Sequence, residues 1–341
     1  MLRSTTESLA ALHDVVMLDL DGVVYVGGEG VPGASEHLAA CREVGTRLAF
    51  VTNNASRTPE TVAEHLRRVG VDATVEDVVT SAQAAAALVR SRHGASARVA
   101  ALGGEGLHAA LAAEDLEVVG VGAPADVVVT GYGPDVLWRD VMAAAVAVRG
   151  GTPWVASNTD RTIPTPQGPA PGHGVLVEML TRFAEVGPAV AGKPSPPLLR
   201  TTIGRTGASR PLMVGDRIDT DIEGGAAVDV ATLLVMTGVS DAAALAECPR
   251  ESRPTYLSAD LAGLLEPQPE PRVDDDVAHV GGWRSWVEDD EAQVDGEGTA
   301  SDWWRALATA LWHHADGTGR VAGTALVHSR VALPATRAAG R

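Results

Sequence analysis

The stretch Val15-Val16-Met17-Leu18-Asp19-Leu20-Asp21-Gly22-Val23 says most about how this chain folds. Its short aliphatic run has no helical period, which predicts a buried strand of a parallel sheet. Because side chains alternate along a strand, we expect Asp19 and Asp21 to point the same way where it ends. Two adjacent carboxylates resist ionising together unless a cation lies between them. The alternative is a strand followed by a polar turn, which Gly22 would permit.

Three further apolar runs end in functional groups of different kinds. Phe50 to Asn54 ends in a hydroxyl and two amides, Val190 to Pro194 contains a lysine, and Pro211 to Asp216 ends in a carboxylate. Asp219 and Asp221 follow on the same turn. In open α/β sheets, ligands bind at the carboxyl ends of the strands. The set therefore predicts metal-assisted transfer of a phosphoryl group.

These segments resemble the four motifs of the haloacid dehalogenase (HAD) superfamily of phosphatases. The matching residues are Asp19 to Val23, Thr52 to Asn54, Lys193-Pro194, and Gly215 to Asp221. The second and fourth motifs resemble those of the branch that contains nitrophenylphosphatase, phosphoglycolate phosphatase and NagD-like enzymes. Over its whole length, the chain also resembles glycerol-3-phosphate phosphatases that carry an acetyltransferase-like C-terminal extension.

The resemblance implies an α/β fold with a Rossmann-like core and parallel sheet, and a Mg²⁺ cofactor. It makes Asp19 the nucleophile that forms an aspartyl-phosphate, and Asp21 the acid and base, whose backbone carbonyl also contacts the metal. Asp19 and Asp216 would ligate Mg²⁺, an oxygen-only site that suits a hard cation. Asp219 or Asp221 would support the metal; Asp221 matches the family position, and Asp219 could instead cap a helix.

The resemblance also implies a set of substrate-binding residues. Thr52, Asn53 and Asn54 belong to the turn whose side chains and N–H groups bind the phosphoryl oxygens. Lys193 would offset the charge of nucleophile and phosphate. Asn158 and Asp160 form an Asn-x-Asp segment that faces the substrate from a cap loop in this branch, although a simple polar turn is an equal alternative.

A chain of 341 residues is too long for one compact core, so we expect two or three units. The long αβ segment between the second and third motifs corresponds to a C2-type cap in the family. Glu266 to Pro271 alternates proline and predicts a stiff linker. The segment after it contains five of the seven tryptophans, which predicts a partly folded module packed on the rest. It lacks a glycine-rich acyl-CoA loop, so we interpret it as a degenerate acetyltransferase-like extension. The expected domains are 1–83 with 190–265 (core), 84–189 (cap), 266–271 (linker) and 272–341 (extension).

Composition restricts the partners. The net charge of −17 argues against a nucleic acid or an anionic membrane, which both need a basic face. Cys41 and Cys248 provide no disulfide framework. No signal peptide is evident and no apolar run reaches the roughly 18 residues that cross a bilayer. We therefore expect a soluble cytoplasmic protein.

We expect a Mg²⁺-dependent phosphomonoesterase. The resemblance favours D-glycerol 3-phosphate, hydrolysed to glycerol and phosphate in glycerolipid recycling. Phosphoglycolate or another small metabolite is the alternative; less favoured are a phosphotransferase or mutase and a non-catalytic binding module. Ser157 to Asp160 offers neutral and acidic groups, which disfavours a substrate carboxylate, but the adjacent Arg161 could reverse this. Caps of this family often mediate dimers, so we expect a homodimer.

Overall fold

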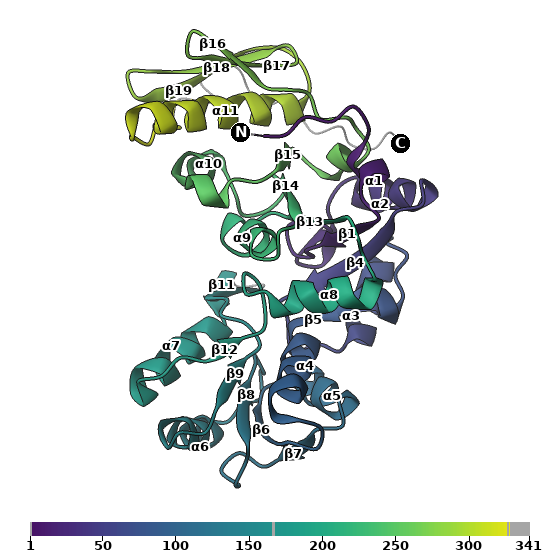
Figure 1. The fold of residues 1–341 in the computed structure, drawn as a ribbon, viewed down its shortest axis with the longest axis vertical. Helices are drawn as coiled ribbons and strands as arrows, with labels where there is room; N and C mark the ends of the chain where they lie inside the picture. Colours follow the sequence, from purple (N-terminus) through teal and green to yellow (C-terminus); the bar gives the residue numbers. More distant parts are fainter. Residues whose placement is uncertain (1, 166–167, 326, 328–341) are drawn as a thin grey trace. The chain divides into compact units, whose positions relative to one another are not determined.

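The computed structural model describes residues 2–165, 168–325 and 327 (Figure 1). The chain forms two compact units. The first unit comprises Met1–Leu48, Val69–Val71 and Ala208–Arg341, and the second comprises Ala49–Arg68 and Asp72–Gly207. Both units contain parallel strands joined by helices, so the predicted α/β class is confirmed.

A parallel sheet lies at the centre of the first unit. Its adjacent strands are β15 (Tyr256–Ser258), β14 (Ala231–Val235), β13 (Pro211–Gly215) and β1 (Val15–Leu18). Every residue of β1 is buried, as expected for a strand covered on both faces. β1 pairs with β13 in a register that sets Leu18 opposite Val214, so the two strands end at the same edge.

The first unit also contains short helices and turns. Thr237 to Asp241 link β14 to the helix that follows, and Asp241 caps that helix through Ala244 N at 2.9 Å. The elements are α1 (Leu9–Leu12), α2 (Ala34–Glu43), a π-helical turn (Ile218–Ile222), α9 (Glu223–Ala226), α10 (Ala242–Glu247), and 3₁₀ turns at Arg250–Ser252 and Leu261–Leu264.

The segment Tyr25 to Gly30 forms a short hairpin. β2 (Tyr25–Val26) pairs antiparallel with β3 (Glu29–Gly30). Gly27 has φ +62°, a conformation that glycine adopts without strain, so here the glycines serve a tight reversal between two strands.

The second unit contains a five-stranded parallel sheet. Its order is β12 (Ala189–Val190), β9 (Trp154–Ala156), β8 (Val127–Thr130), β6 (Arg98–Leu102) and β7 (Glu117–Val119). These strands lie between residues 98 and 190, within or at the end of the range 84–189 expected for a cap. The cap boundaries themselves stay a prediction.

Helices cover this sheet. α6 (Trp138–Arg149) and α7 (His173–Ala184) pack against each other, and Figure 1 draws both on the same side of the strands. Their buried side chains, among them Val141, Val148 and Leu180, share an apolar cluster with strand residues. The remaining elements of the unit are α4 (Ser81–His93), α5 (Glu105–Ala113), and the hairpin of β10 (Thr162–Thr165) and β11 (Gly168–Pro171).

A further pair of strands in the second unit carries the predicted phosphate-binding turn. β4 (Arg47–Thr52) pairs in parallel with β5 (Val78–Thr80), and Thr52 lies opposite Thr80. α3 (Pro59–Arg68) begins after Thr58, whose hydroxyl accepts from Thr61 N at 3.4 Å. A 3₁₀ turn (Val75–Asp77) and α8 (Pro197–Thr206) complete this part.

Residues 272–296 form a four-stranded antiparallel sheet in the first unit. Its strands are β16 (Arg272–Asp274), β17 (Val277–Val280), β18 (Trp283–Glu288) and β19 (Glu291–Gly296), in that order. Asp275-Asp276 and Asp289-Asp290 join two of the hairpins, and all four residues have positive φ. Two-residue loops of this conformation match the right-handed twist of the flanking strands. These four aspartates therefore form the loops of two hairpins.

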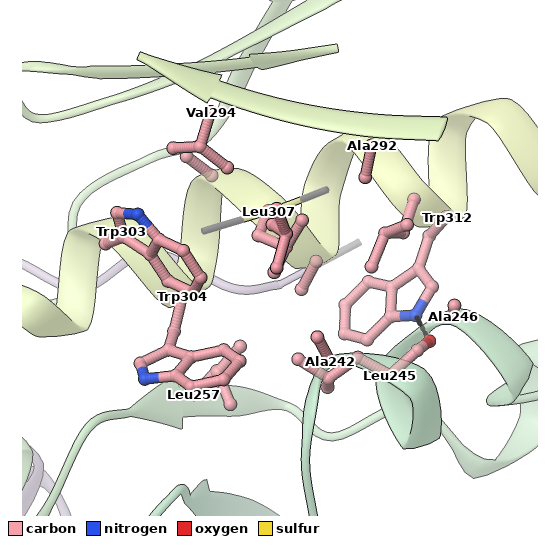
Figure 2. Close-up of a cluster of buried hydrophobic side chains, with 14 of the residues drawn as sticks. Ala242, Leu245, Ala246, Leu257, Ala292, Val294, Trp303, Trp304, Leu307 and Trp312 are labelled. Atoms are coloured by element: carbon pink, nitrogen blue, oxygen red, sulfur yellow. Dashed lines mark hydrogen bonds between the residues drawn. The ribbon is translucent and has the colours of Figure 1, made fainter. Parts of the chain in front are cut away.

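α11 (Ala300–Thr318) packs against this sheet on one side and contacts β15 and α10 elsewhere on its surface (Figure 2). Eleven of its residues are buried, so it behaves as a core helix. Trp303, Trp304 and Trp312 share one apolar cluster with Leu245 and Leu257. The three tryptophans of α11 are thus buried within the first unit. The extension as a separate domain, and its acetyltransferase-like character, stay predictions.

The proline-rich segment 266–271 is held by its neighbours. Gln268 is buried, and its Nε2 donates to the Gly263 carbonyl at 2.9 Å. The Arg305 guanidinium of α11 donates to Gln268 Oε1 at 2.6 Å and to the Leu257 carbonyl at 2.8 Å. The segment therefore joins the extension to the parallel sheet through buried hydrogen bonds.

Within the described ranges, no helix has the length and apolarity needed to cross a bilayer.

Candidate active site

Three carboxylates gather at the carboxyl edge of the first unit's parallel sheet. Asp19 follows β1 and its N–H donates to the Val214 carbonyl at 2.8 Å; Asp216 follows β13; Asp221 lies on the π-helical turn. One oxygen of each lies within 4.8 Å of the others. Asp216 and Asp221 are buried, and Asp19 is half-buried. We call Asp19, Asp216 and Asp221 the carboxylate site.

Three glycines leave room for the carboxylate site. A Cβ at Gly238 would lie 1.9 Å from Asp216 Oδ2, and one at Gly22 would lie 2.4 Å from the same oxygen. A Cβ at Gly215 would lie 2.1 Å from the Asp221 Cβ. Since real Cβ contacts do not fall below about 3.0 Å, each position admits glycine only unless the carboxylates move.

The loop after β14 holds Asp216 in place, a role that was not predicted from the sequence. Val239 N donates to Asp216 Oδ2 at 2.7 Å, and Ser240 N donates to the Asp216 carbonyl at 3.2 Å. The Thr237 hydroxyl donates to the Gly22 carbonyl at 2.5 Å, which ties the same loop to the turn after β1. The pair Thr237-Gly238, shortly after an apolar strand, is the pattern that could have indicated this loop.

Asp21 and Asp219 lie outside the carboxylate site. Asp21 is exposed, and the turn after it is fixed by a hydrogen bond from Gly22 N to the Tyr25 carbonyl at 2.8 Å. Asp219 pairs with Arg217 at 2.7 Å. Asp221 accepts from Arg217 N at 3.1 Å and faces the other two carboxylates. Of the two residues left open by the sequence, the structure brings Asp221 into the group.

The second unit has a hydrogen-bonded cluster centred on Asn53. Its Nδ2 donates to Asp160 Oδ1 at 2.9 Å and to the Lys193 carbonyl at 3.1 Å, and its Oδ1 accepts from Lys193 N at 2.8 Å. Asn158 Nδ2 donates to the Asn53 carbonyl at 2.7 Å. Four residues predicted from separate parts of the sequence therefore lie together; we call Asn53, Asn158, Asp160 and Lys193 the amide cluster.

Asn158 shapes the loop that carries Asp160. Its Oδ1 accepts from Asp160 N at 3.1 Å, and its backbone carbonyl lies 2.8 Å from His173 Nδ1. A carbonyl only accepts, so His173 donates through Nδ1. Burial lowers the pKa of His173 to about 4, which keeps the ring neutral. His173 was not among the residues predicted from the sequence, and a local sign of its tight packing is that it lies between Gly172 and Gly174.

Thr52 and Asn54 shape the turn after β4. Thr52 Oγ1 accepts from Asn54 N at 3.1 Å. Asn54 Oδ1 accepts from Ser56 N at 3.0 Å and Arg57 N at 3.1 Å, so this amide oxygen is engaged in the turn. The Lys193 ammonium is buried and donates to the Val51 carbonyl at 3.4 Å, which places a positive charge beside this turn.

Arg161, which could have offered a cation to a substrate carboxylate, pairs with Glu178 of α7. Its Nε donates to Glu178 Oε1 at 2.8 Å, and its Nη2 forms an ion pair with the same oxygen. Both side chains are exposed, so the pair is a surface feature of the second unit.

Two family models match the chain. One, described as haloacid dehalogenase-like hydrolase, matches residues 16–117, and one described as HAD-hydrolase-like matches residues 190–264. The D-glycerol 3-phosphate phosphatase of Mycobacterium tuberculosis is 40% identical over 321 residues, 90% of this chain and 88% of the relative. An acid sugar phosphatase of Staphylococcus aureus is 36% identical over 251 residues, 73% of this chain and 95% of the relative.

Solved structures agree with these matches. A glycerol phosphate phosphatase from Mycobacterium tuberculosis in complex with magnesium has a TM-score of 0.81 at 38% identity, covering 90% of this chain and 93% of that one. A 4-nitrophenylphosphatase from Thermotoga maritima has a TM-score of 0.70 at 27% identity, covering 75% and 98%. The chain therefore belongs to the haloacid dehalogenase superfamily and, within it, to the nitrophenylphosphatase- and NagD-like phosphatases.

Proposed function

We propose that this protein is a Mg²⁺-dependent phosphomonoesterase that hydrolyses D-glycerol 3-phosphate to glycerol and phosphate. The observation that carries the proposal is the carboxylate site: three aspartates from β1, β13 and the following turn, with their oxygens within 4.8 Å. Two of them are buried, and like charges this close favour a bound cation. Carboxylate oxygens are the donors that Mg²⁺ prefers, so the residues fit the ion.

Asp19 is the proposed nucleophile. Its carboxylate attacks phosphorus and the alkoxide leaves, so that an aspartyl-phosphate forms. Asp21 gives a proton to the leaving oxygen and later takes one from the attacking water, which releases phosphate and restores Asp19. The exposure of Asp21 supports this role because its proton must exchange with solvent.

Asp216 and Asp221 would hold the metal together with Asp19, and the family motif would add the backbone carbonyl of Asp21. When bound, Mg²⁺ withdraws charge from the phosphoryl oxygens. Thr52 and Asn53, with the N–H groups of their turn, bind those oxygens, and Lys193 offsets their charge.

The cap loop and the relatives support the choice of D-glycerol 3-phosphate as the substrate. A phosphoglycolate carboxylate needs a positive partner, whereas a polyol needs neutral donors and acceptors. Arg161 is engaged with Glu178, while Asn158 and Asp160 provide amide and carboxylate groups. The 40% identity to a D-glycerol 3-phosphate phosphatase supports the same choice. A sugar phosphate is the second candidate because an acid sugar phosphatase is 36% identical.

A panel of small phosphate esters, ranked by kcat/KM with Mg²⁺ present, tests the substrate. We expect glycerol 3-phosphate to lead. A tenfold preference for phosphoglycolate, about 1.4 kcal/mol of transition-state stabilisation, would contradict the substrate assignment. Release of inorganic phosphate in proportion to substrate separates a hydrolase from a phosphotransferase or mutase, which would pass the group to a second alcohol.

Asp19→Asn tests the chemistry. It should abolish turnover in a folded protein, whereas Asp219→Asn serves as the matched control. Asp219 belongs to the same motif but forms an exposed ion pair with Arg217, and such pairs contribute about 0–1 kcal/mol. Retained activity in Asp19→Asn, or equal losses in both variants, would contradict the mechanism and leave a binding module as the better explanation.

We also propose a cytoplasmic location and a homodimer. The two cysteines are free and buried, which supports a reducing compartment. The family resemblance supports the dimer. Caps that close over a site admit only small substrates, so the proposed partner is a small phosphorylated metabolite, with no nucleic acid and no membrane insertion.

A further inference from the structure

Gly22 directly follows Asp21, the proposed acid and base, and the carboxylate site leaves no room for a larger residue there. A Cβ on Gly22 would lie 2.4 Å from Asp216 Oδ2, and its φ of +86° favours glycine. Glycine has more conformational freedom than any other residue. Close packing at the carboxylate site therefore requires a flexible residue next to the group that must deliver a proton.

Hydrogen bonds on both sides of Gly22 restrict this freedom. Its N–H donates to the Tyr25 carbonyl at 2.8 Å, which orients the peptide plane between Asp21 and Gly22. Its carbonyl accepts from the Thr237 hydroxyl at 2.5 Å, which orients the next peptide plane. Because peptide groups are planar, holding both planes sets the two dihedral angles of Gly22 and, with them, the direction of the chain at Asp21.

These two bonds differ in where they come from. The bond to Tyr25 lies within the turn, and so does the bond that Val24 N donates to the Leu20 carbonyl at 2.9 Å, so both close the turn on itself. Thr237 instead reaches the turn from a segment 215 residues further along the chain. Its hydroxyl therefore fixes the turn relative to the loop after β14, which the bonds within the turn do not do.

The loop that carries Thr237 is also held by other bonds. On one side, Met236 N donates to the Ser258 carbonyl of β15 at 3.1 Å. On the other side, Val239 N donates to Asp216 Oδ2 at 2.7 Å. With backbone contacts on either side of Thr237, the loop keeps its place without the hydroxyl. The hydroxyl therefore serves the turn that it reaches rather than the loop that carries it.

We propose that Thr237 is a positioning residue for the acid and base Asp21. The inference rests on the proposed phosphatase reaction and adds a residue to it. When Asp19 attacks phosphorus, the bond to the leaving oxygen breaks and Asp21 transfers its proton to that oxygen. The transfer requires the Asp21 carboxyl within hydrogen-bond reach of that oxygen, and such acid catalysis contributes about 100- to 10,000-fold to a rate. A turn that samples several conformations loses part of this contribution.

The dependence on the leaving group tests this role. Glycerol 3-phosphate releases a basic alkoxide that needs a proton, whereas 4-nitrophenyl phosphate releases a stable phenolate that leaves without one. Thr237→Val removes the hydroxyl and keeps the branched shape. Its kcat/KM should fall about 10- to 100-fold with glycerol 3-phosphate and less than about threefold with 4-nitrophenyl phosphate. Thr237→Ser keeps the hydroxyl and should restore kcat/KM to within about threefold of the wild type with both esters.

Thr46→Val is the matched control. Thr46 is buried in the same unit and its hydroxyl donates to the Ala10 carbonyl at 2.6 Å, so this variant loses an equivalent bond outside the site. It should keep the wild-type kcat/KM with both esters. Thr237→Ala removes the same hydroxyl and should repeat the selective loss, which keeps the test decisive if valine disturbs folding. Melting curves show which variants fold.

Three results would overturn the inference. The first is an equal loss with both esters in Thr237→Val; a higher Mg²⁺ requirement in that variant would then assign the effect to Asp216. The second is activity of the folded Thr237 variants within about threefold of the wild type with both esters. The third is the same selective loss in Thr46→Val. A wild type that releases phosphate from neither ester would refute the proposed function itself, and this inference with it.

Discussion

Gly238→Ala should disable the carboxylate site without unfolding the protein. The added Cβ would lie 1.9 Å from Asp216 Oδ2, 2.5 Å from its Cγ and 2.7 Å from its Cβ. Ordinary contact begins near 3.4 Å, so the carboxylate oxygen must retreat by 3.4 minus 1.9, about 1.5 Å. The retreat would also stretch the hydrogen bond that Val239 N donates to this oxygen.

The expected loss follows from the displacement. A misplacement of about 1 Å in a positioned group can reduce the rate about 100-fold, which corresponds to about 2.7 kcal/mol of transition-state stabilisation. Because Asp216 is a proposed metal ligand, the loss should appear both in kcat/KM and as a higher Mg²⁺ concentration for half-maximal activity. A titration of activity against Mg²⁺ with glycerol 3-phosphate measures both.

Gly317→Ala is the control. Gly317 lies in α11 of the same unit with open space around the added Cβ, and alanine is favoured over glycine in a helix by up to about 1 kcal/mol. This variant should keep full activity and melt at the same or a higher temperature. If Gly238→Ala retains activity within threefold of wild type at all Mg²⁺ concentrations, the crowding argument fails. It also fails if both glycine variants lose activity equally.

Three further outcomes are expected. First, because the pKa of His173 is lowered, the unfolded chain binds a proton between pH 6.5 and about 4 and the folded chain does not. The free energy of unfolding should therefore fall by up to about 3 kcal/mol as pH drops through this range. His173→Gln should remove this pH dependence from denaturation curves. Second, Trp312→Ala removes a buried side chain and the hydrogen bond to the Leu245 carbonyl, so urea unfolding should show a loss of about 3–5 kcal/mol, against little change for Val321→Ala at the surface. Third, chelation with EDTA should abolish phosphate release and added Mg²⁺ should restore it; activity that persists after dialysis against chelator would exclude the proposed role of the carboxylate site.

The parallel strands could be predicted because strands that are buried on both faces consist of uninterrupted apolar residues. β1, β8 and β13 coincide with such runs, and the chemistry sits where each run ends. The antiparallel strands β16 to β19 escaped prediction because they alternate apolar with charged residues and are joined by Asp-Asp turns. The tryptophans predicted that this segment packs on the rest, but the charged residues between the apolar ones concealed its strands.

The candidate site was predictable in its acids and amides but not in what holds them. Asp19, Asp216 and Asn53 directly follow strands, so their residue types and positions indicate that they belong to a site. Gly238 and His173 act through close packing and a backbone carbonyl. Such roles depend on which segments meet in space, which the spacing of residues along the chain does not encode.

The two groups of site residues are positioned by different physical means, and this determines how each should respond to change. The carboxylate site is fixed by shape: glycines at 22, 215 and 238 let backbone and carboxylates approach closely, and a single methyl group has no room. The amide cluster is fixed by directional hydrogen bonds. The Asn53 side chain bonds to the Asp160 carboxylate and to both the N–H and the carbonyl of Lys193. Added volume should therefore damage the first group most, and the loss of one donor or acceptor should damage the second. A buried donor left without its acceptor costs about 1–3 kcal/mol, so the amide cluster is sensitive even to an isosteric substitution of Asn53 that leaves its shape intact.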